Sequence, residues 1–444
     1  MSLSAFRNKF PSSGVFSAVF VLAGTALLFA SLDGSYVLPL DHEAILYAKT
    51  PLADPVSRLE KQVQDGSVKL EYDPHFGYLR SVLRQLDVPV SSQILVFSKT
   101  SFQAPRISPR TPRAIYFNDR VSVGWVRGGD VIEISSVDPK QGTVFHTIDQ
   151  GESSTPSIRR RDECLQCHLS PRTLGIPGGV VRSVFPDPSG MPLFQAGSFV
   201  TDHRSPFSER WGGWYVTGRH GSQTHMGNSV VRSKTQPEEL DRSDSSNVTD
   251  LRWRFDTGSY LSAHSDIVAL MVLEHQVRMQ NLITRVGYET RMALHSQAAL
   301  GNLFSKPGEL SESTQRRING PVEYLLEYLL FMDEVALEAP VEGTSKFAAE
   351  FMQAGPRDKQ GRSLRDFDLK TRMFKYPCSY LIYSEAFDNL PGPAKERVYR
   401  RLWEILSGED KSPMFADLSS DDRKAILEIL LETKENLPAY WQRG

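Results

Sequence analysis

The sequence has few cysteines, little net charge and only one long hydrophobic run, and each scarcity excludes a class of protein. Three cysteines in 444 residues leave no disulfide framework. The formal net charge is −2, so the chain lacks the basic excess of a nucleic-acid-binding protein and we expect no nucleic-acid partner. Charged residues at 23% and hydrophobic residues at 40% are typical of a globular protein with two or three domains.

The long hydrophobic run lies close to the amino terminus. Residues 14–32 carry no charge, Arg7 and Lys9 precede them, and Asp33 follows. Positive charge before such a run predicts that the remainder of the chain crosses the membrane. The length lies between a signal-peptide core and a spanning helix. Because no clean A-x-A cleavage site follows, we predict that residues 1–34 form a retained anchor, with the rest in the periplasm at the inner membrane.

Two of the cysteines belong to one motif. Cys164 and Cys167 are separated by two residues and His168 follows at once, which is the attachment signature of a c-type haem. Each thiol can add to one vinyl group of the porphyrin, and His168 can bind the iron as an axial ligand. A zinc site would need a second Cys or His pair, but Cys378 is isolated and is interpreted as a buried apolar residue. We therefore predict one covalently bound haem c.

Three further residues are candidates for the second axial position. His225 and Met226 are neighbours in a glycine-flanked segment, and either imidazole or thioether suits iron. His275 lies on the apolar side of a predicted helix, where a bundle core can hold a cofactor ligand. Each of them can instead be ordinary packing, and the sequence leaves the choice open. We expect one of them to close the iron site.

Arginines near the motif are candidate partners for the haem propionates, because guanidinium groups pair with carboxylates. These candidates are Arg172, Arg182, Arg204 and Arg219. His203 and His220 each adjoin one of these arginines and are expected near solvent or a propionate. The aromatic residues of the same stretch, expected against the porphyrin or in the core, are Trp211, Trp214 and Tyr215.

The secondary-structure pattern changes from strand to helix at about residue 245. Alternating or short apolar runs predict strands at 93–97, 113–117, 121–126, 131–134 and 142–148. Apolar residues at helical spacing predict helices at 267–300, 322–337, 346–353, 394–406 and 421–433. We predict an α+β protein in which residues 35–245 form a small antiparallel sheet with a loop-rich haem-binding region. Residues 246–444 are predicted to form a helical C-terminal domain.

Three stretches together resemble a protein family. They are residues 106–119 (RISPRTPRAIYFND), the single CxxCH motif, and residues 210–218 (RWGGWYVTG) with 225–228 (HMGN). The chain is similar here to a family of uncharacterised bacterial exported proteins with a cytochrome c domain and one haem. The resemblance spans most of the chain after the anchor. It implies covalent haem and export, and it implies no substrate.

These observations predict a periplasmic cytochrome that transfers single electrons to or from a redox partner protein. One alternative is a haem enzyme acting on peroxide or another small oxidant, with His225 and Arg219 as its acid–base group and cation. Another is a haem-based sensor in which ligand capture moves the helical domain. The chain is much larger than simple electron carriage requires, which favours a dedicated partner or an added activity.

Overall fold

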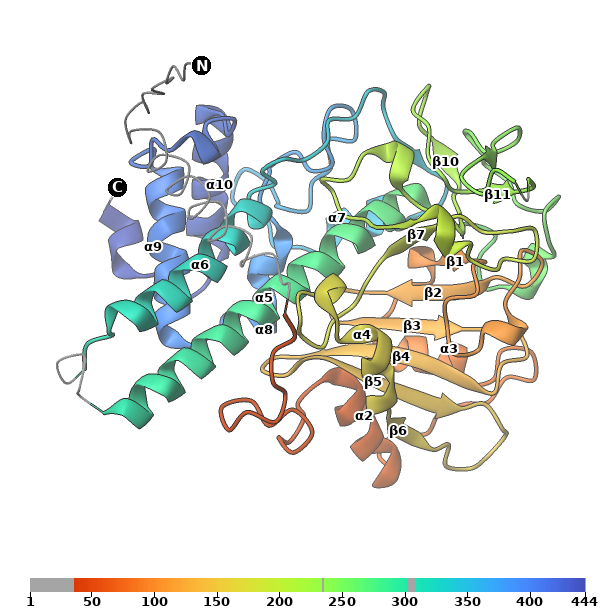
Figure 1. The fold of residues 1–444 in the computed structure, drawn as a ribbon, viewed down its shortest axis with the longest axis horizontal. Coiled ribbons are helices and arrows are strands. Elements are labelled where there is room, and N and C mark those ends of the chain that lie inside the picture. The colour runs from red at the N-terminus through yellow and green to blue at the C-terminus, as the bar shows by residue number, and fades with distance from the viewer. Residues whose placement is uncertain (1–35, 234, 302–307, 444) are drawn as a thin grey trace, which may run out of the picture.

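The described chain is an α+β protein, as the sequence predicts. The structure is a computed structural model that describes residues 36–233, 235–301 and 308–443. A seven-stranded antiparallel sheet lies at one side of the molecule and most of the helices lie at the other (Figure 1). The predicted anchor at residues 1–34 lies outside the described residues.

The sheet has the strand order β6-β5-β4-β3-β2-β1-β9. Its strands are β1 (Ile94–Val96), β2 (Arg113–Phe117), β3 (Val121–Trp125), β4 (Val131–Asp138), β5 (Gly142–Asp149), β6 (Ile158–Arg160) and β9 (Trp214–Tyr215). The first five match the predicted strands, and short turns join β2 to β5. Gly142 has a φ of +72° at the turn before β5, a conformation that favours glycine. β9 comes from a much later segment and pairs with β1 at the edge of the sheet.

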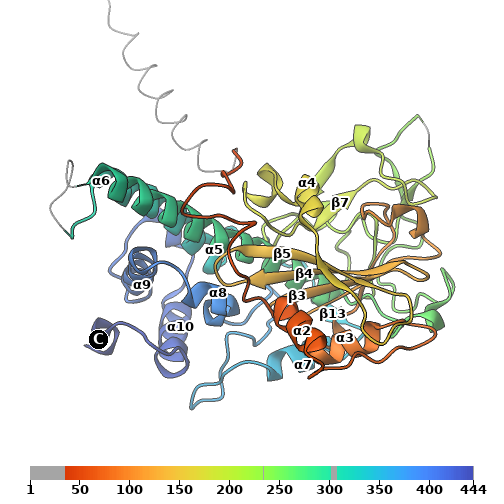
Figure 2. The ribbon, with the colours of Figure 1, turned by 90° about the horizontal axis from the view of Figure 1, so that it is seen from below.

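One face of the sheet packs against α2 (Pro55–Gln64) and α3 (Leu79–Gln85), which lie below it in Figure 2. Successive strand residues point to opposite faces, and alternate residues of β2 to β5 therefore join this apolar cluster. They are Ala114, Tyr116, Val121, Val123, Trp125, Ile132, Ile134 and Ile148. Asp54 caps α2 and lies 3.3 Å from Nε2 of His146 on β5. This buried contact joins the helix to the sheet.

The opposite face of the sheet is more polar and partly exposed. It carries residues from alternate positions of the same strands, among them Arg113, Ile115, Ser122, Glu133 and Ser135. Figure 2 shows α4 (Leu165–His168) and β7 (Arg182–Val184) on this side, away from α2 and α3. β7 pairs with β8 (Ser198–Val200) in a separate hairpin.

The helical region is arranged around one long helix. Its helices are α5 (Ile267–Leu300), α6 (Glu312–Leu329), α7 (Phe347–Gln353), α8 (Glu385–Asp388), α9 (Gly392–Leu406) and α10 (Ser420–Thr433). α5 has the predicted bounds. α6 begins ten residues before the predicted start, and the helix continues through Pro321.

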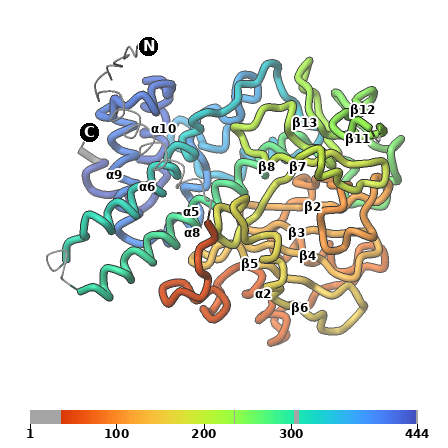
Figure 3. Tube along the Cα trace, in the orientation of Figure 1, coloured from red at the N-terminus to blue at the C-terminus, as the bar shows by residue number. Residues whose placement is uncertain are grey.

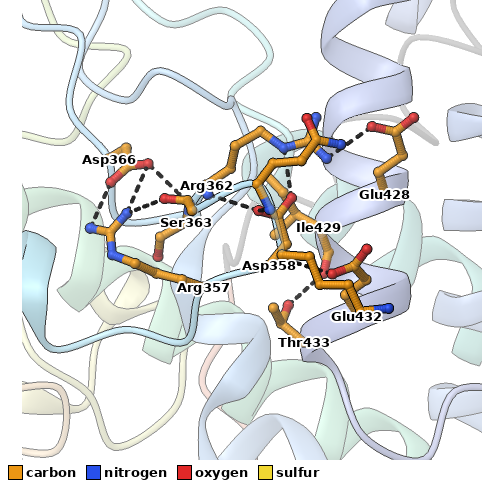
Figure 4. A network of polar contacts seen from close by, with 12 residues as sticks. Arg357, Asp358, Arg362, Ser363, Asp366, Glu428, Ile429, Glu432 and Thr433 are labelled. Carbon is orange, nitrogen blue, oxygen red and sulfur yellow. Dashed lines mark hydrogen bonds and ion pairs between the residues drawn. The ribbon is translucent and has the colours of Figure 1, made fainter.

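Charged side chains fasten the loop between α7 and α8 to α10 (Figure 4). Arg362 donates to Asp358 at 2.6 Å and to Glu428 of α10 at 2.8 Å. The backbone N–H of Lys359 donates to Glu432 of the same helix at 2.7 Å. The long connection is therefore held by α10 rather than free at the surface.

The strand-rich and helix-rich regions share one hydrophobic core. Its buried side chains come from β1, β2 and β9 as well as from α5, α6, α9 and α10. Strand pairing also crosses residue 245, since β10 (Gly218–Arg219) pairs with β13 (Glu342–Gly343). A further hairpin of β11 (Val230–Val231) and β12 (Leu240–Asp241) lies at the far end of the sheet from β6 (Figure 3).

The prediction of a transmembrane helix is corrected. Within residues 36–233, 235–301 and 308–443, no helix has the length and apolar character to cross a membrane. The run at residues 14–32, on which the prediction depended, lies outside the described residues.

Candidate functional site

The CxxCH motif forms a short helical turn on the polar side of the sheet. Cys164 ends a 3-10 turn with φ −60° and ψ −24°, and α4 continues directly from it through Cys167 and His168. Residues three apart on a helix lie on the same side, so the two thiols share one face. Both cysteines are free, Cys167 is exposed and Cys164 is partly buried. Two thiols so placed can be alkylated by one ligand.

Two hydrogen bonds with Gly178 fix His168. Its backbone carbonyl accepts from the N–H of Gly178 at 3.0 Å, and its Nδ1 lies 3.0 Å from the carbonyl oxygen of Gly178. A carbonyl only accepts, so Nδ1 carries the proton and Nε2 carries the lone pair. Burial lowers the pKa of His168, which keeps the ring neutral at neutral pH. No hydrogen bond to Nε2 occurs within the described residues, so this nitrogen is available to a metal.

The floor beneath α4 is formed by β2, β4 and β5. The ring of Phe145 lies 4.6 Å from the ring of His168, measured between centroids. Arg113 of β2 donates to Glu133 of β4, with Nη2–Oε2 at 2.7 Å. Burial raises the pKa of Cys164. The two charged groups add smaller, opposing effects: Glu133 raises this pKa and Arg113 lowers it.

Two of the four candidate propionate arginines lie beside Cys167. Burial lowers the pKa of Arg182, Arg172 lowers it further, and Cys167 opposes this effect. Arg182 donates to Ser198 Oγ at 2.9 Å, whereas Arg172, five residues after Cys167, is exposed. The structure thus brings Arg172 and Arg182 together with the motif.

Arg204 lies in a surface pocket that Arg172 also lines, together with Arg278 of α5. Its guanidinium donates to Asp202 at 2.9 Å. Nη2 of Arg278 donates to the hydroxyl of Tyr324 at 2.9 Å. The pocket therefore begins next to the motif, but the guanidinium groups of Arg204 and Arg278 within it already have hydrogen-bond partners.

Arg219 lies elsewhere. It is exposed on β10 and pairs in register with Glu342 of β13. In Figure 1, β10 lies near β11 and well away from α4. His220, the next residue, accepts a hydrogen bond at Nε2 from the N–H of Asn247 at 2.9 Å. The structure does not bring Arg219 and His220 to the CxxCH motif.

His225 and Met226 lie in the core behind β7. The ring of His225 packs against Trp211 and His220, and burial lowers its pKa to about 3. The sulfur of Met226 lies 3.4 Å from Ser183 Oγ. Successive residues of β7 point to opposite sides, so Ser183 and the sulfur of Met226 lie on the other side of the strand from Arg182.

His275 has no free ring nitrogen. Its Nδ1 lies 2.9 Å from Nδ1 of His203, and its Nε2 lies 2.8 Å from Ser379 Oγ. The ring is fully buried between Tyr328 and Phe331. Both nitrogens of His275 are occupied by neighbours in the core, so it is a packed core histidine.

The prediction that the chain is a metal-binding protein is also corrected as far as protein ligands alone are concerned. In the part of the chain that the structure describes, no group of three or more His, Cys, Asp or Glu side chains could hold a metal ion. One of His225, Met226 and His275 was expected to be the second axial ligand of the iron, and the structure buries all three in the core. The physical reason is packing: His225 contacts Trp211, Met226 contacts Ser183 and His275 stacks on Phe331.

The sequence did not indicate several residues of the site. Arg113, Glu133 and Phe145 lie at alternate positions of predicted strands, but only the strand register brings them under α4. Gly178 contributes a backbone carbonyl, which no side-chain motif can reveal. Trp214 and Tyr215, expected near a porphyrin or in the core, are core residues of β9.

Comparisons of the chain with models of protein families, with curated proteins and with solved structures found no match. The resemblance to exported cytochrome c domain proteins therefore stays a prediction.

Proposed function

We propose that the chain carries one haem c, bound covalently through Cys164 and Cys167, and that it transfers single electrons. The observation that carries the proposal is the hydrogen bonding of His168. Its Nδ1 is committed to the carbonyl of Gly178, and this leaves a neutral Nε2 as the axial donor, as second-shell contacts do for metal-bound histidines. When bound, haem supplies a one-electron couple between ferric and ferrous iron.

The residues around the motif are suited to such a ligand. The two thiols lie on one face of a helical turn, and Phe145 gives an apolar surface beside His168. Arg172 and Arg182 offer guanidinium groups for the two carboxylates of a porphyrin. Nε of Arg113 and Oγ1 of Thr147 are buried on the same face without a hydrogen-bond partner among the described residues. A flat ligand with polar groups at its edge would contact all of these residues if it bound on this face.

Covalent haem also bears on location and partners. Haem c is attached outside the cytoplasm, so the proposal places the mature chain in the periplasm. An exposed Cys167 implies that the edge of the cofactor near this thiol lies at the surface. We propose that a redox partner protein docks at this side of the sheet, where α4 is accessible (Figure 2).

The peroxide-enzyme alternative depends on His225 and Arg219 at the iron. Arg219 is exposed on β10, and His225 is buried behind β7. Neither group lies on the face that carries His168. The geometry therefore gives no support to this pair as acid–base group and cation.

The test is a double variant, Cys164→Ala with Cys167→Ala, produced in a host that matures c-type cytochromes. Haem staining after denaturing electrophoresis should be positive for wild type and absent for the variant. Cys378→Ala is the matched control, because this thiol is buried in the helical core and should leave staining unchanged. Stained haem on the double variant would contradict the proposal. Reversible conversion of the visible spectrum by one-electron mediators then tests electron transfer separately.

A further inference from the structure

The ion pair of Arg113 and Glu133 lies across the sheet face beneath the motif. Arg113 belongs to β2 and Glu133 to β4, so the guanidinium must cross β3. Gly124 on β3 allows this crossing, because a Cβ there would lie 2.3 Å from Nη2 of Arg113. The absence of a side chain at Gly124 thus permits the two charges to meet at 2.7 Å.

Neutral partners hold the Glu133 carboxylate in place. Its Oε1 accepts from Ser101 Oγ at 2.6 Å and from Nε2 of Gln103 at 3.1 Å, while Oε2 faces Arg113. Only 14% of its side-chain surface is exposed, against 21% for Arg113. Charges held in such a partly buried position act on neighbours more strongly than charges in open solvent.

The ion pair lies on the same sheet face as the proposed axial ligand. Glu133 pairs in register with Thr147 of β5, two residues after Phe145, whose ring centroid lies 4.6 Å from that of His168. Alternate residues of a strand share one face, so Glu133, Thr147 and Phe145 all belong to the floor beneath α4. The two charges are therefore part of the surface against which His168 packs.

We propose that Arg113 and Glu133 are positioning residues that set the reduction potential of the cofactor bound at His168. This inference rests on the proposed function. Ferric haem carries one more positive charge than ferrous haem, so a nearby carboxylate favours the oxidised state and a nearby guanidinium favours the reduced state. The two charges oppose each other in wild type, so removing either one alone should shift the potential.

The experiment measures midpoint potentials of purified haem-loaded variants by spectroelectrochemical titration. Glu133→Gln should raise the potential and Arg113→Gln should lower it. The double variant should return close to wild type, because the two charges are removed together. Asp241→Asn is the matched control: its carboxylate pairs with Arg232 at 2.6 Å on the distant β11–β12 hairpin, and its removal should leave the potential unchanged.

Shifts in the same direction, or no shift beyond that of Asp241→Asn, would overturn the inference. A purely structural ion pair would lower the unfolding temperature of both single variants without opposite changes in potential. Haem staining of each variant separates this failure from failure of the proposed function, because a chain with no covalent haem refutes the latter. If one single variant does not fold, the other still tests the claim, because each is expected to shift the potential in its own direction.

Discussion

The two histidine environments of this protein, at α4 and at α5, differ in almost every physical respect. His168 lies on an open, polar sheet face, with one ring nitrogen bonded to a backbone carbonyl. His275 lies in the shared core with both ring nitrogens bonded to side chains. The comparison shows that a histidine becomes a candidate ligand when the fold fixes one nitrogen and leaves the other accessible. Full burial with complete hydrogen bonding indicates a structural role.

The region around α5 also contains a fully buried carboxyl group, whereas the charges beneath α4 are only partly buried. Glu274 adjoins His275 in the chain and is fully buried. Its carboxylate lies 3.5 Å from the guanidinium of Arg210 and accepts from Thr201 Oγ1 at 2.5 Å. Burial nevertheless raises the pKa of Glu274 to about 7, against the opposing attraction of Arg210. The free energy of unfolding of the core around α5 should therefore depend on pH.

The largest expected effect comes from His275→Ala. Removing the ring leaves a cavity among Tyr328 and Phe331 and leaves buried polar groups of His203 and Ser379 without partners. We expect a loss of about 4 kcal/mol in the free energy of unfolding, measured by denaturant titration of the protein. His295→Ala is the control, since His295 is a surface residue near Glu43, and should change stability by less than about 0.5 kcal/mol. Equal losses in the two variants would contradict the comparison.

The next effect concerns Glu274→Gln and pH. The raised pKa means that the folded state keeps a proton that the unfolded carboxyl loses above its ordinary pKa of 4.5. This stabilisation is present below pH 4.5 and is lost as the pH rises to about 7. Between pH 5 and pH 8, wild type should lose about 2 kcal/mol relative to Glu274→Gln. Denaturant titrations at both pH values measure the difference, and a constant difference would show that the carboxyl has no raised pKa.

The sequence predicted the parts of the fold that depend on local patterns. Alternation of apolar residues located β2 and β3, and helical spacing located α5 with its observed bounds. Pairings between distant segments could not be predicted, such as β9 with β1 or β10 with β13. These pairings depend on tertiary packing, since no local property of Trp214 specifies Val96 as its partner.

The candidate site was predictable to a similar extent. The CxxCH spacing indicated Cys164, Cys167 and His168, and proximity in sequence indicated Arg172 and Arg182. Single-sequence reasoning could not separate His275 from a ligand, because a histidine on an apolar helix face has the same pattern in both roles. The structure identifies His275 as a core residue, because His203 and Ser379 lie at its two ring nitrogens.

The smallest expected effect on stability comes from His168→Ala, and it completes the comparison. The substitution removes one hydrogen bond to Gly178 and the ring contact with Phe145, both at a partly exposed position. We expect a loss of about 1 kcal/mol in the unfolding free energy of the chain before haem attachment. The haem-loaded variant should keep covalent haem at both cysteines, while the visible spectra of its oxidised and reduced forms change because the imidazole donor is gone. Spectra identical to wild type would show that His168 is not the axial ligand. A stability loss as large as that of His275→Ala would instead show that His168 is a core histidine.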